Sequence, residues 1–486
     1  MKSTFVNSIV LSLIISLLSC DQPDIESPLE INFNSRAYVS LEIFNISSAR
    51  NFKFSYLPRL YPRRRETPEY NINSDTTLIV ELITNMPQEF DFNLIDLQIP
   101  FFSVPNDTVH ISIDLKNGDI NYSGINQNIN RYLLSKTKIQ RKIDARRSEI
   151  YNDESLSYSE FCSNLDSVSK VERKIIDTTT LDLPKWFRLL TDKNIDFKTA
   201  YSKLSLPNYR NFLKLENSNM PSKADLEFLS SIDLTSPYNQ YVSSFYSFMN
   251  FYSFYLIYGD NYVISDSVQL LFNDLSQSTR MFEAALKTDL TEDNFLAFAT
   301  AQTISDIGLV RDRRKGRLEY LDSMYGPESS VVKYLVAVDS ELAQYNLKSG
   351  DTAPSFYLED LNKNLHSLQD HRGRIVLLNF YTPGCVACKK EVPYERELQA
   401  KYEDNFQIIN VCMTDSKESF QKTYSKFQLE GINVFTPGSW MKKLRDKYMI
   451  NGYPHYVLVD RDGNIVKNHA FKPSSKKLEP LIESIL

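Results

Sequence analysis

Two cysteines stand three residues apart, in surroundings that favour redox chemistry. Cys385 and Cys388 follow an apolar stretch that predicts a buried strand, and they open a segment of helical periodicity. A thiol at a helix N-terminus faces free backbone N–H groups and the positive end of the helix dipole, which favour the thiolate. A residue three positions further lies one turn away on the same face, within reach of a disulfide. The spacing therefore predicts a redox-active pair.

Charged residues follow the pair directly. Lys389 and Lys390 add positive charge, and Glu391 lies three residues beyond Cys388. Because residues three apart share a helix face, the Glu391 carboxylate can approach Cys388 and take its proton during thiol exchange.

Other uses of two cysteines fit less well. Zinc needs two further ligands, and neither a second CxxC nor a histidine pair adjoins the first. The histidines show no ligand spacing: His110, His366, His371, His455 and His469. A purely structural disulfide would close a very short loop and stabilise the fold little. We therefore expect no metal site and no cofactor.

The elements around the pair alternate between strand and helix after Ser349. Strands are expected at 355–358, 375–381, 406–413, 456–459 and 465–467. Helices are expected at 385–402, 418–427 and 440–448, with a last helix at the end of the chain. This alternation predicts an α/β sheet with the cysteine pair at the end of a central strand.

An ordered set of motifs makes this segment resemble a known family. The motifs are Gly350–Phe356, Ile375–Phe380, Cys385–Pro393 and Gly452–Pro454. Together they resemble the TlpA/ResA group of membrane-anchored thioredoxin-like proteins. The resemblance implies a thioredoxin-like domain over residues 346–486. It implies that Cys385 is the attacking thiol, Cys388 the resolving thiol and Glu391 the acid/base. Tyr453 and Pro454 would form the cis-proline loop that shapes the substrate groove.

The sequence also departs from that family next to the pair. Gly384 stands where the family usually has tryptophan, and Val386-Ala387 replaces dipeptides that end in proline. Asn379 stands where thioredoxins proper have a buried aspartate, which again favours the TlpA/ResA type. These differences surround the site, so they bear on its reduction potential and its substrate surface.

A second resemblance concerns the loop before the first cysteine. Thr382–Cys385 is similar to the peroxidatic loop of some peroxiredoxins, which implies a thiol peroxidase. Those enzymes place a proline seven residues before the cysteine, where this chain has Leu378. Cys388 and Glu391 fit disulfide exchange better.

The N-terminus has the features of a targeting segment. Lys2 precedes an apolar stretch, Phe5–Leu18, which is too short to span a bilayer comfortably. Leu17–Cys20 resembles a bacterial lipoprotein signal, which implies removal of residues 1–19 and lipidation of Cys20. An ordinary secretory signal with an incidental cysteine is the alternative. Residues 20–28 are then a tether, and the protein is anchored to a membrane of the bacterial cell envelope, facing the periplasm or exposed at the surface.

Two further domains are expected between the tether and the α/β segment. Residues 29–125 alternate apolar and polar side chains and contain many prolines, which predicts a small antiparallel, β-sandwich-like domain. Residues 126–345 have helical periodicity and predict an all-α domain. We expect its prolines to mark helix boundaries, at Pro207, Pro221 and Pro237. The predicted fold is thus multidomain, with β, all-α and thioredoxin-like α/β parts.

Charge and cysteine content argue against a nucleic-acid-binding protein and against a disulfide-stapled fold. The 55 basic and 61 acidic residues give a net charge of −6, so we expect no nucleic-acid partner. Five cysteines in 486 residues cannot form a disulfide-stapled fold. Cys162 and Cys412 are left over, and we expect both to be buried thiols.

These features lead to one preferred function and two alternatives. The preferred function is a membrane-anchored thiol-disulfide oxidoreductase, a reductase or isomerase of protein disulfides. Its partners would be disulfide-containing protein substrates and a membrane or envelope electron donor. The first alternative is an envelope lipoprotein that binds a protein partner and has a secondary redox domain. The second is a peroxiredoxin-like thiol peroxidase.

Overall fold

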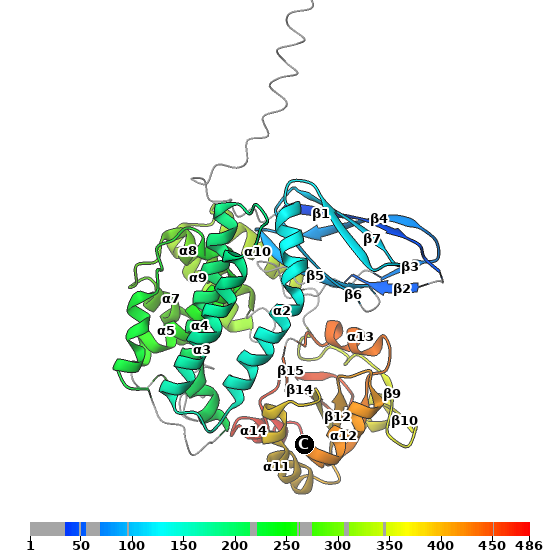
Figure 1. Cartoon of the computed structure of the whole chain (residues 1–486). Helices are drawn as coiled ribbons and strands as arrows, with labels where there is room; N and C mark the ends of the chain where they lie inside the picture. Colours follow the sequence, from blue (N-terminus) through cyan, green and yellow to red (C-terminus); the bar gives the residue numbers. More distant parts are fainter. Residues whose placement is uncertain are drawn as a thin grey trace, which may run out of the picture. The chain divides into compact units, whose positions relative to one another are not determined.

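The computed structural model describes most of the chain beyond Asn34. The described residues are 35–47, 50–54, 69–94, 97–213, 221–259, 262, 275–305, 311–343, 347–450 and 452–486. The predicted signal, the tether and Cys20 lie outside them. The described residues divide into two compact units, one ending at Gln302 and the other beginning at Thr303. Figure 1 labels their helices and strands. The domain limits expected from the sequence stay predictions.

The first unit begins with β-structure. Strands β1 (Arg36–Phe44), β4 (Thr76–Ile83), β7 (Thr108–Asp114) and β8 (Asp119–Ser123) form one sheet in the order β4-β1-β7-β8. Two further pairs are β2 (Arg50–Lys53) with β3 (Glu69–Ile72), and β5 (Gln88–Leu94) with β6 (Leu97–Ser103). The antiparallel prediction is wrong for one pairing, because β1 and β7 are parallel. Only strands joined by a tight hairpin must be antiparallel, and β1 and β7 are far apart in the chain.

Helices follow in the described part of this unit. They are α2 (Gln127–Asn152), α3 (Tyr158–Asp177), α4 (Lys185–Leu213), α5 (Ser243–Tyr258), α7 (Leu275–Ala285) and α8 (Glu292–Ser305), with short 3-10 turns η1 (Ala224–Ser231) and η2 (Asn239–Tyr241). The helical periodicity expected here is confirmed for the described residues, whereas an all-α domain over residues 126–345 stays a prediction. Helix α2 packs on β6, where the Asn130 Oδ1 accepts a 2.7 Å hydrogen bond from the Phe102 backbone N–H. The β-strands and helices therefore share one packed unit.

Pro207 does not mark a helix boundary as the sequence suggested, because α4 continues through it to Leu213. Proline has no N–H, so the carbonyl of Lys203, four residues earlier, loses its helical donor. The hydroxyl of Tyr158, on α3, donates to that carbonyl at 3.0 Å. A donor from a neighbouring helix thus lets α4 tolerate the proline.

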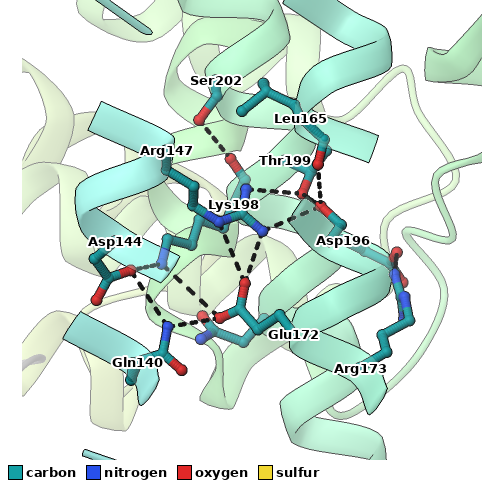
Figure 2. A network of polar contacts seen from close by, with 12 residues as sticks. Gln140, Asp144, Arg147, Leu165, Glu172, Arg173, Asp196, Lys198, Thr199 and Ser202 are labelled. Carbon is teal, nitrogen blue, oxygen red and sulfur yellow. Dashed lines mark hydrogen bonds and ion pairs between the residues drawn. The ribbon is translucent and has the colours of Figure 1, made fainter. Parts of the chain in front are cut away.

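A buried polar network joins α2, α3 and α4 (Figure 2). The Arg147 guanidinium donates to the Glu172 carboxylate at 2.7 and 3.2 Å, to the Ser169 hydroxyl at 3.1 Å and to the Thr199 hydroxyl at 3.4 Å. The Gln140 amide donates to the other Glu172 oxygen at 2.9 Å. Because a buried charge is costly without partners, this network favours one packing of the three helices.

The second unit contains α9 (Arg311–Tyr325), α10 (Ser330–Ala343) and an α/β sheet. The five strands run in the order β13-β12-β11-β14-β15, with bounds Ile432–Phe435, Phe406–Cys412, Ile375–Tyr381, His455–Val459 and Ile465–Asn468. Strand β11 is parallel to β12 and antiparallel to β14, and all its residues are buried. A small hairpin, β9 (Tyr357–Glu359) with β10 (Leu365–Ser367), precedes it. The predicted α/β architecture is confirmed.

Helices cover both faces of this sheet. Helices α11 (Val386–Lys401), α12 (Lys417–Phe427) and α14 (Leu478–Glu483) pack on the face that includes Leu377, Tyr381 and Ile408. Helix α13 (Trp440–Lys447) packs on the opposite face, against Leu378 and Phe380. Alternate residues of β11 therefore supply two separate cores.

The segment before β9 pairs along the β15 edge of the sheet. The Gly350 N–H donates to the Ile465 carbonyl at 2.8 Å, and the Ile465 N–H donates to the Asp351 carbonyl at 2.7 Å. The Ala353 N–H donates a third bond, to the Gly463 carbonyl at 3.0 Å. These bonds fix the start of the α/β fold to its last strand.

In the part of the chain that the structure describes, no helix combines the length and the apolar character needed to cross a membrane.

Candidate redox site

Cys385 and Cys388 form a disulfide at the N-terminus of α11. Cys385 is the N-cap residue, its Sγ accepts the Cys388 backbone N–H at 3.1 Å, and the two Cα atoms are 5.3 Å apart. This confirms the predicted position at a helix N-terminus. Cys388 is buried, with 2% of its surface exposed, whereas Cys385 is half-buried. Cys385 is therefore the more accessible sulfur.

The loop before the pair depends on a glycine. Gly384 has φ +77°, a conformation that residues with side chains rarely adopt. The Cys385 N–H closes the turn by donating to the Thr382 carbonyl at 3.2 Å. A tryptophan at position 384, as in the resembled family, would need a different backbone. The glycine that replaces the family's tryptophan at position 384 thus matches the backbone conformation of this loop.

Glu391 lies on the buried face of α11, one turn beyond Cys388. Its two carboxylate oxygens accept hydrogen bonds from Ser474, one from the backbone N–H at 2.9 Å and one from the hydroxyl at 3.0 Å. Ser474 belongs to the connection between β15 and α14. In the disulfide state, these bonds orient the carboxylate toward Ser474.

The Tyr453–Pro454 peptide bond is cis, as expected from the resemblance. Tyr453 packs against the cluster that contains the buried Cys388 and Tyr381, and Cys385 packs against the same cluster. The loop before β14 therefore lies beside the cysteine pair. Both Tyr453 and Pro454 are half-buried, which leaves part of each available to a substrate.

Two histidines lie behind this loop. His455 is buried, its ring lies 4.4 Å from that of His469 between centroids, and its Nε2 is 3.3 Å from Asn468 Oδ1. Burial lowers the pKa of His455 well below its ordinary value, and the neighbouring His469 lowers it further. Burial, with Lys467, lowers the pKa of His469 to about 4. Both rings are therefore neutral near pH 7.

A buried carboxyl on α11, two turns beyond Cys388, was missed from the sequence. The Glu395 Oε1 accepts the Tyr456 hydroxyl at 2.6 Å and the Asn379 amide at 2.9 Å. Asn379 also donates to Asn410 Oδ1 on β12 at 2.9 Å. Burial raises the pKa of Glu395 to about 7, with a smaller contribution from the charge of Glu391 and against the hydrogen bond from Tyr456, which lowers it. The signal in the sequence was a glutamate four residues after Glu391, on the helix face that also has apolar residues.

The remaining described cysteines are thiols. Cys412 is fully buried at the end of β12, as predicted, and burial raises its pKa to about 12. The prediction of burial is wrong for Cys162, which is only partly buried, although this partial burial still raises its pKa to about 11. Neither resembles an activated thiol, because activation needs a lowered pKa.

Comparison with known proteins places this site in a family. The Redoxin family model matches residues 348–482. Thioredoxin-like protein YneN of Bacillus subtilis is 29% identical over 140 residues, which are 29% of this chain and 82% of YneN. Thiol-disulfide oxidoreductase ResA of Geobacillus kaustophilus is 31% identical over 137 residues, 28% of this chain and 77% of ResA. The crystal structure of the thioredoxin domain of a Bacteroides vulgatus thiol-disulfide oxidoreductase shares 30% identity and covers 29% of this chain and 98% of that chain, with a TM-score of 0.27.

The C-terminal part of the chain is therefore a thioredoxin-fold domain of the Redoxin type. Through this domain the chain belongs to the ResA-like thiol-disulfide oxidoreductases, and the protein is an oxidoreductase enzyme. The resemblance noted in the sequence is confirmed at the level of the family.

Proposed function

We propose that the protein is a lipid-anchored envelope enzyme that exchanges disulfides with protein substrates through Cys385 and Cys388. The observation that carries the proposal is the unequal burial of a bonded pair at a helix N-terminus. A half-buried sulfur can meet a substrate, and a buried sulfur one turn away can only meet its partner. This asymmetry gives the two cysteines different roles.

The first half of the reaction uses Cys385. In the reduced enzyme its thiolate is stabilised by the free N–H groups of the first turn of α11, of which that of Cys388 already points at Sγ. The thiolate attacks one sulfur of a substrate disulfide. A Cys385–substrate disulfide forms, the substrate S–S bond breaks, and the second substrate sulfur leaves with the electron pair and takes a proton from solvent.

The second half uses Cys388 and Glu391. Glu391 takes the proton of the Cys388 thiol, and the Cys388 thiolate attacks the sulfur of Cys385. The internal disulfide re-forms, and the substrate leaves as a dithiol. The enzyme has then lost two electrons, so a second dithiol protein of the envelope must reduce it again. A steadily reduced enzyme would act as a reductase or an isomerase.

The location follows from the N-terminal sequence. Cleavage before Cys20 and its diacylation would hold the enzyme at a membrane, because two acyl chains anchor stably where one does not. Loss of membrane association in a Cys20→Ser variant, measured by fractionation of cells, is the expected result. An unchanged membrane fraction would rule out this anchor.

Substrate trapping tests the exchange mechanism. A Cys388→Ala variant should accumulate mixed disulfides that migrate as large species in non-reducing gels and collapse on reduction. A Cys385→Ala variant should accumulate none, and a Cys412→Ala variant should behave as the parent. If the Cys388→Ala variant traps no partner through Cys385, the exchange mechanism is wrong.

The chain outside residues 348–482 motivates the alternative of a binding lipoprotein, because the Redoxin match leaves the packed β and helical unit unexplained. A variant with both Cys385→Ser and Cys388→Ser separates the two functions. Full retention of the cellular phenotype would favour binding. Peroxide turnover that survives loss of Cys388 would instead favour a peroxidase.

A further inference from the structure

Three side chains follow one another along the buried face of α11. Cys388, Glu391 and Glu395 are spaced by three and four residues, so they share one face of the helix. Their exposed fractions are 2%, 6% and 1%. A second buried carboxyl therefore lies one turn beyond the acid/base of the proposed mechanism, on the side away from the cysteines.

The surroundings of Glu395 suit a carboxyl that holds a proton. Its Oε1 has two donors, Tyr456 and Asn379, but its buried Oε2 has no hydrogen-bond partner among the described residues. Within the same described part of the chain, the buried Asn379 Oδ1 also has none. A buried carboxylate normally accepts hydrogen bonds at both oxygens, whereas a neutral carboxyl has its own proton on one of them. The buried Oε2 is thus the position at which a neutral Glu395 would hold its proton.

We propose that Glu395 is a positioning residue for the exchange reaction: by releasing its proton it makes the adjacent Glu391 a stronger acceptor for the proton of Cys388. This inference rests on the proposed role of Glu391 in the resolving step. Two buried carboxylates on successive turns repel each other, and the charge of Glu391 raises the pKa of Glu395. A negative charge on Glu395 then favours transfer of a proton to Glu391.

The charged and titratable groups that act on Glu395 come from three elements. They are Glu391 on α11, Tyr456 on β14 and Tyr381 on β11. Burial raises the pKa of both tyrosines well above their ordinary values, so both stay neutral at physiological pH. Asn379 and Asn410 carry no charge. Near neutral pH the tyrosines keep their protons, so the titration expected here is that of Glu395.

The role proposed for Glu395 does not change which bonds form and break in the resolving step. The proton moves from Cys388 Sγ to Glu391, the Cys388–Cys385 bond forms, and the Cys385–substrate bond breaks. The substrate sulfur leaves with the electron pair. Glu395 forms no bond and transfers no electron, since its proton passes to solvent before the step as the pH rises through about 7.

The test follows the resolving step alone. The reduced full chain, with Cys20 and Cys162 replaced by serine, is mixed with 5,5′-dithiobis(2-nitrobenzoate) in a stopped-flow instrument. Attack by Cys385 releases the first nitrothiobenzoate, and resolution by Cys388 releases the second. The parent should resolve faster as the pH rises through about 7. Glu395→Gln should remove this inflection and slow resolution at pH 8.5 by roughly tenfold, the effect of about one unit in acceptor strength.

Two further variants distinguish an effect of Glu395 on proton transfer from a purely structural role. Tyr456→Phe removes the hydroxyl that lowers the pKa of Glu395, so its inflection should move to higher pH. Glu397→Gln changes an exposed carboxyl of the same helix and should match the parent. A resolving rate with the same pH profile in Glu395→Gln and parent overturns the inference. If the parent itself releases no second nitrothiobenzoate, the proposed exchange function fails instead.

Discussion

Replacing His469 with asparagine should make the C-terminal unit less sensitive to acid. His469 has φ 55°, and asparagine is among the few residues that tolerate this left-handed conformation. The variant therefore removes the titrating ring and keeps the backbone. The ring that remains, His455, stays packed against Phe380, with centroids 5.8 Å apart.

The magnitude follows from the pKa of His469, which burial lowers from 6.5 to about 4. As the pH falls below 6.5, the unfolded chain binds a proton that the folded chain does not bind until about pH 4. Stability from this group is thus complete above pH 6.5 and is lost as the pH falls toward 4. The full loss is about 3 kcal/mol, from 1.36 kcal/mol per unit, and roughly 2 kcal/mol of it falls between pH 7 and 5.

Other groups contribute to the same pH range. His455 has the same sign, because burial lowers its pKa too. Glu395 has the opposite sign: its pKa is raised from 4.5 to about 7, so the stability it contributes is complete below pH 4.5 and is lost as the pH rises through 7. The informative quantity is therefore the difference between parent and variant in the change from pH 7 to 5.

Guanidinium unfolding followed by fluorescence measures that difference. The chain has two tryptophans, so a Trp186→Phe background leaves Trp440 as the reporter of the C-terminal unit. His469→Asn should lose roughly 2 kcal/mol less than the parent between pH 7 and 5. His110→Gln, at an exposed position on β7, is the control and should lose as much as the parent. Equal losses in His469→Asn and parent would refute the reasoning.

Three further predictions concern other buried groups. Arg147→Met leaves the buried Glu172 carboxylate without its main partner and should lower the free energy of unfolding by about 3–5 kcal/mol; a loss below about 1 kcal/mol, measured by Trp186 fluorescence, would contradict this. Tyr158→Phe removes the donor to the Lys203 carbonyl and should cost about 1–3 kcal/mol in the same assay, so no measurable change would argue against that role. Cys412 should resist iodoacetamide at pH 8 until the chain unfolds, because burial raises its pKa to about 12, and rapid labelling of the folded chain would show otherwise.

The parts of the fold that the sequence predicted well depend on local patterns. The apolar run Ile375–Tyr381, interrupted by Asn379, predicts a strand buried on both faces, and β11 has those bounds. Cys385 was expected at a helix N-terminus and is the N-cap of α11. In both cases the residues that determine the structure are neighbours in the chain.

The errors and omissions come from partners that are distant in the chain. The local sequence does not show that β1 pairs with β7, because these two strands are far apart in the chain and other strands lie between them in sequence. Pro207 ends a helix by local rules, but Tyr158 supplies the missing donor from another helix. The local sequence does not distinguish Glu395 from a surface charge, because its hydrogen-bond partners Asn379 and Tyr456 are distant in the chain.

The pairing of residues 350–353 with β15 decides where the redox domain can be separated from the rest of the chain. An open sheet edge presents unpaired N–H and C=O groups and is a template for association with other chains. A truncated protein that begins at Pro354 would uncover the edge that Gly350 and Ala353 now occupy. One that begins before Lys348, whose N–H donates to the Asp351 carboxylate at 2.6 Å, keeps that edge covered. Residues 350–353, which lie outside the regular strands, thus cover a sheet edge that could otherwise pair with another chain and aggregate.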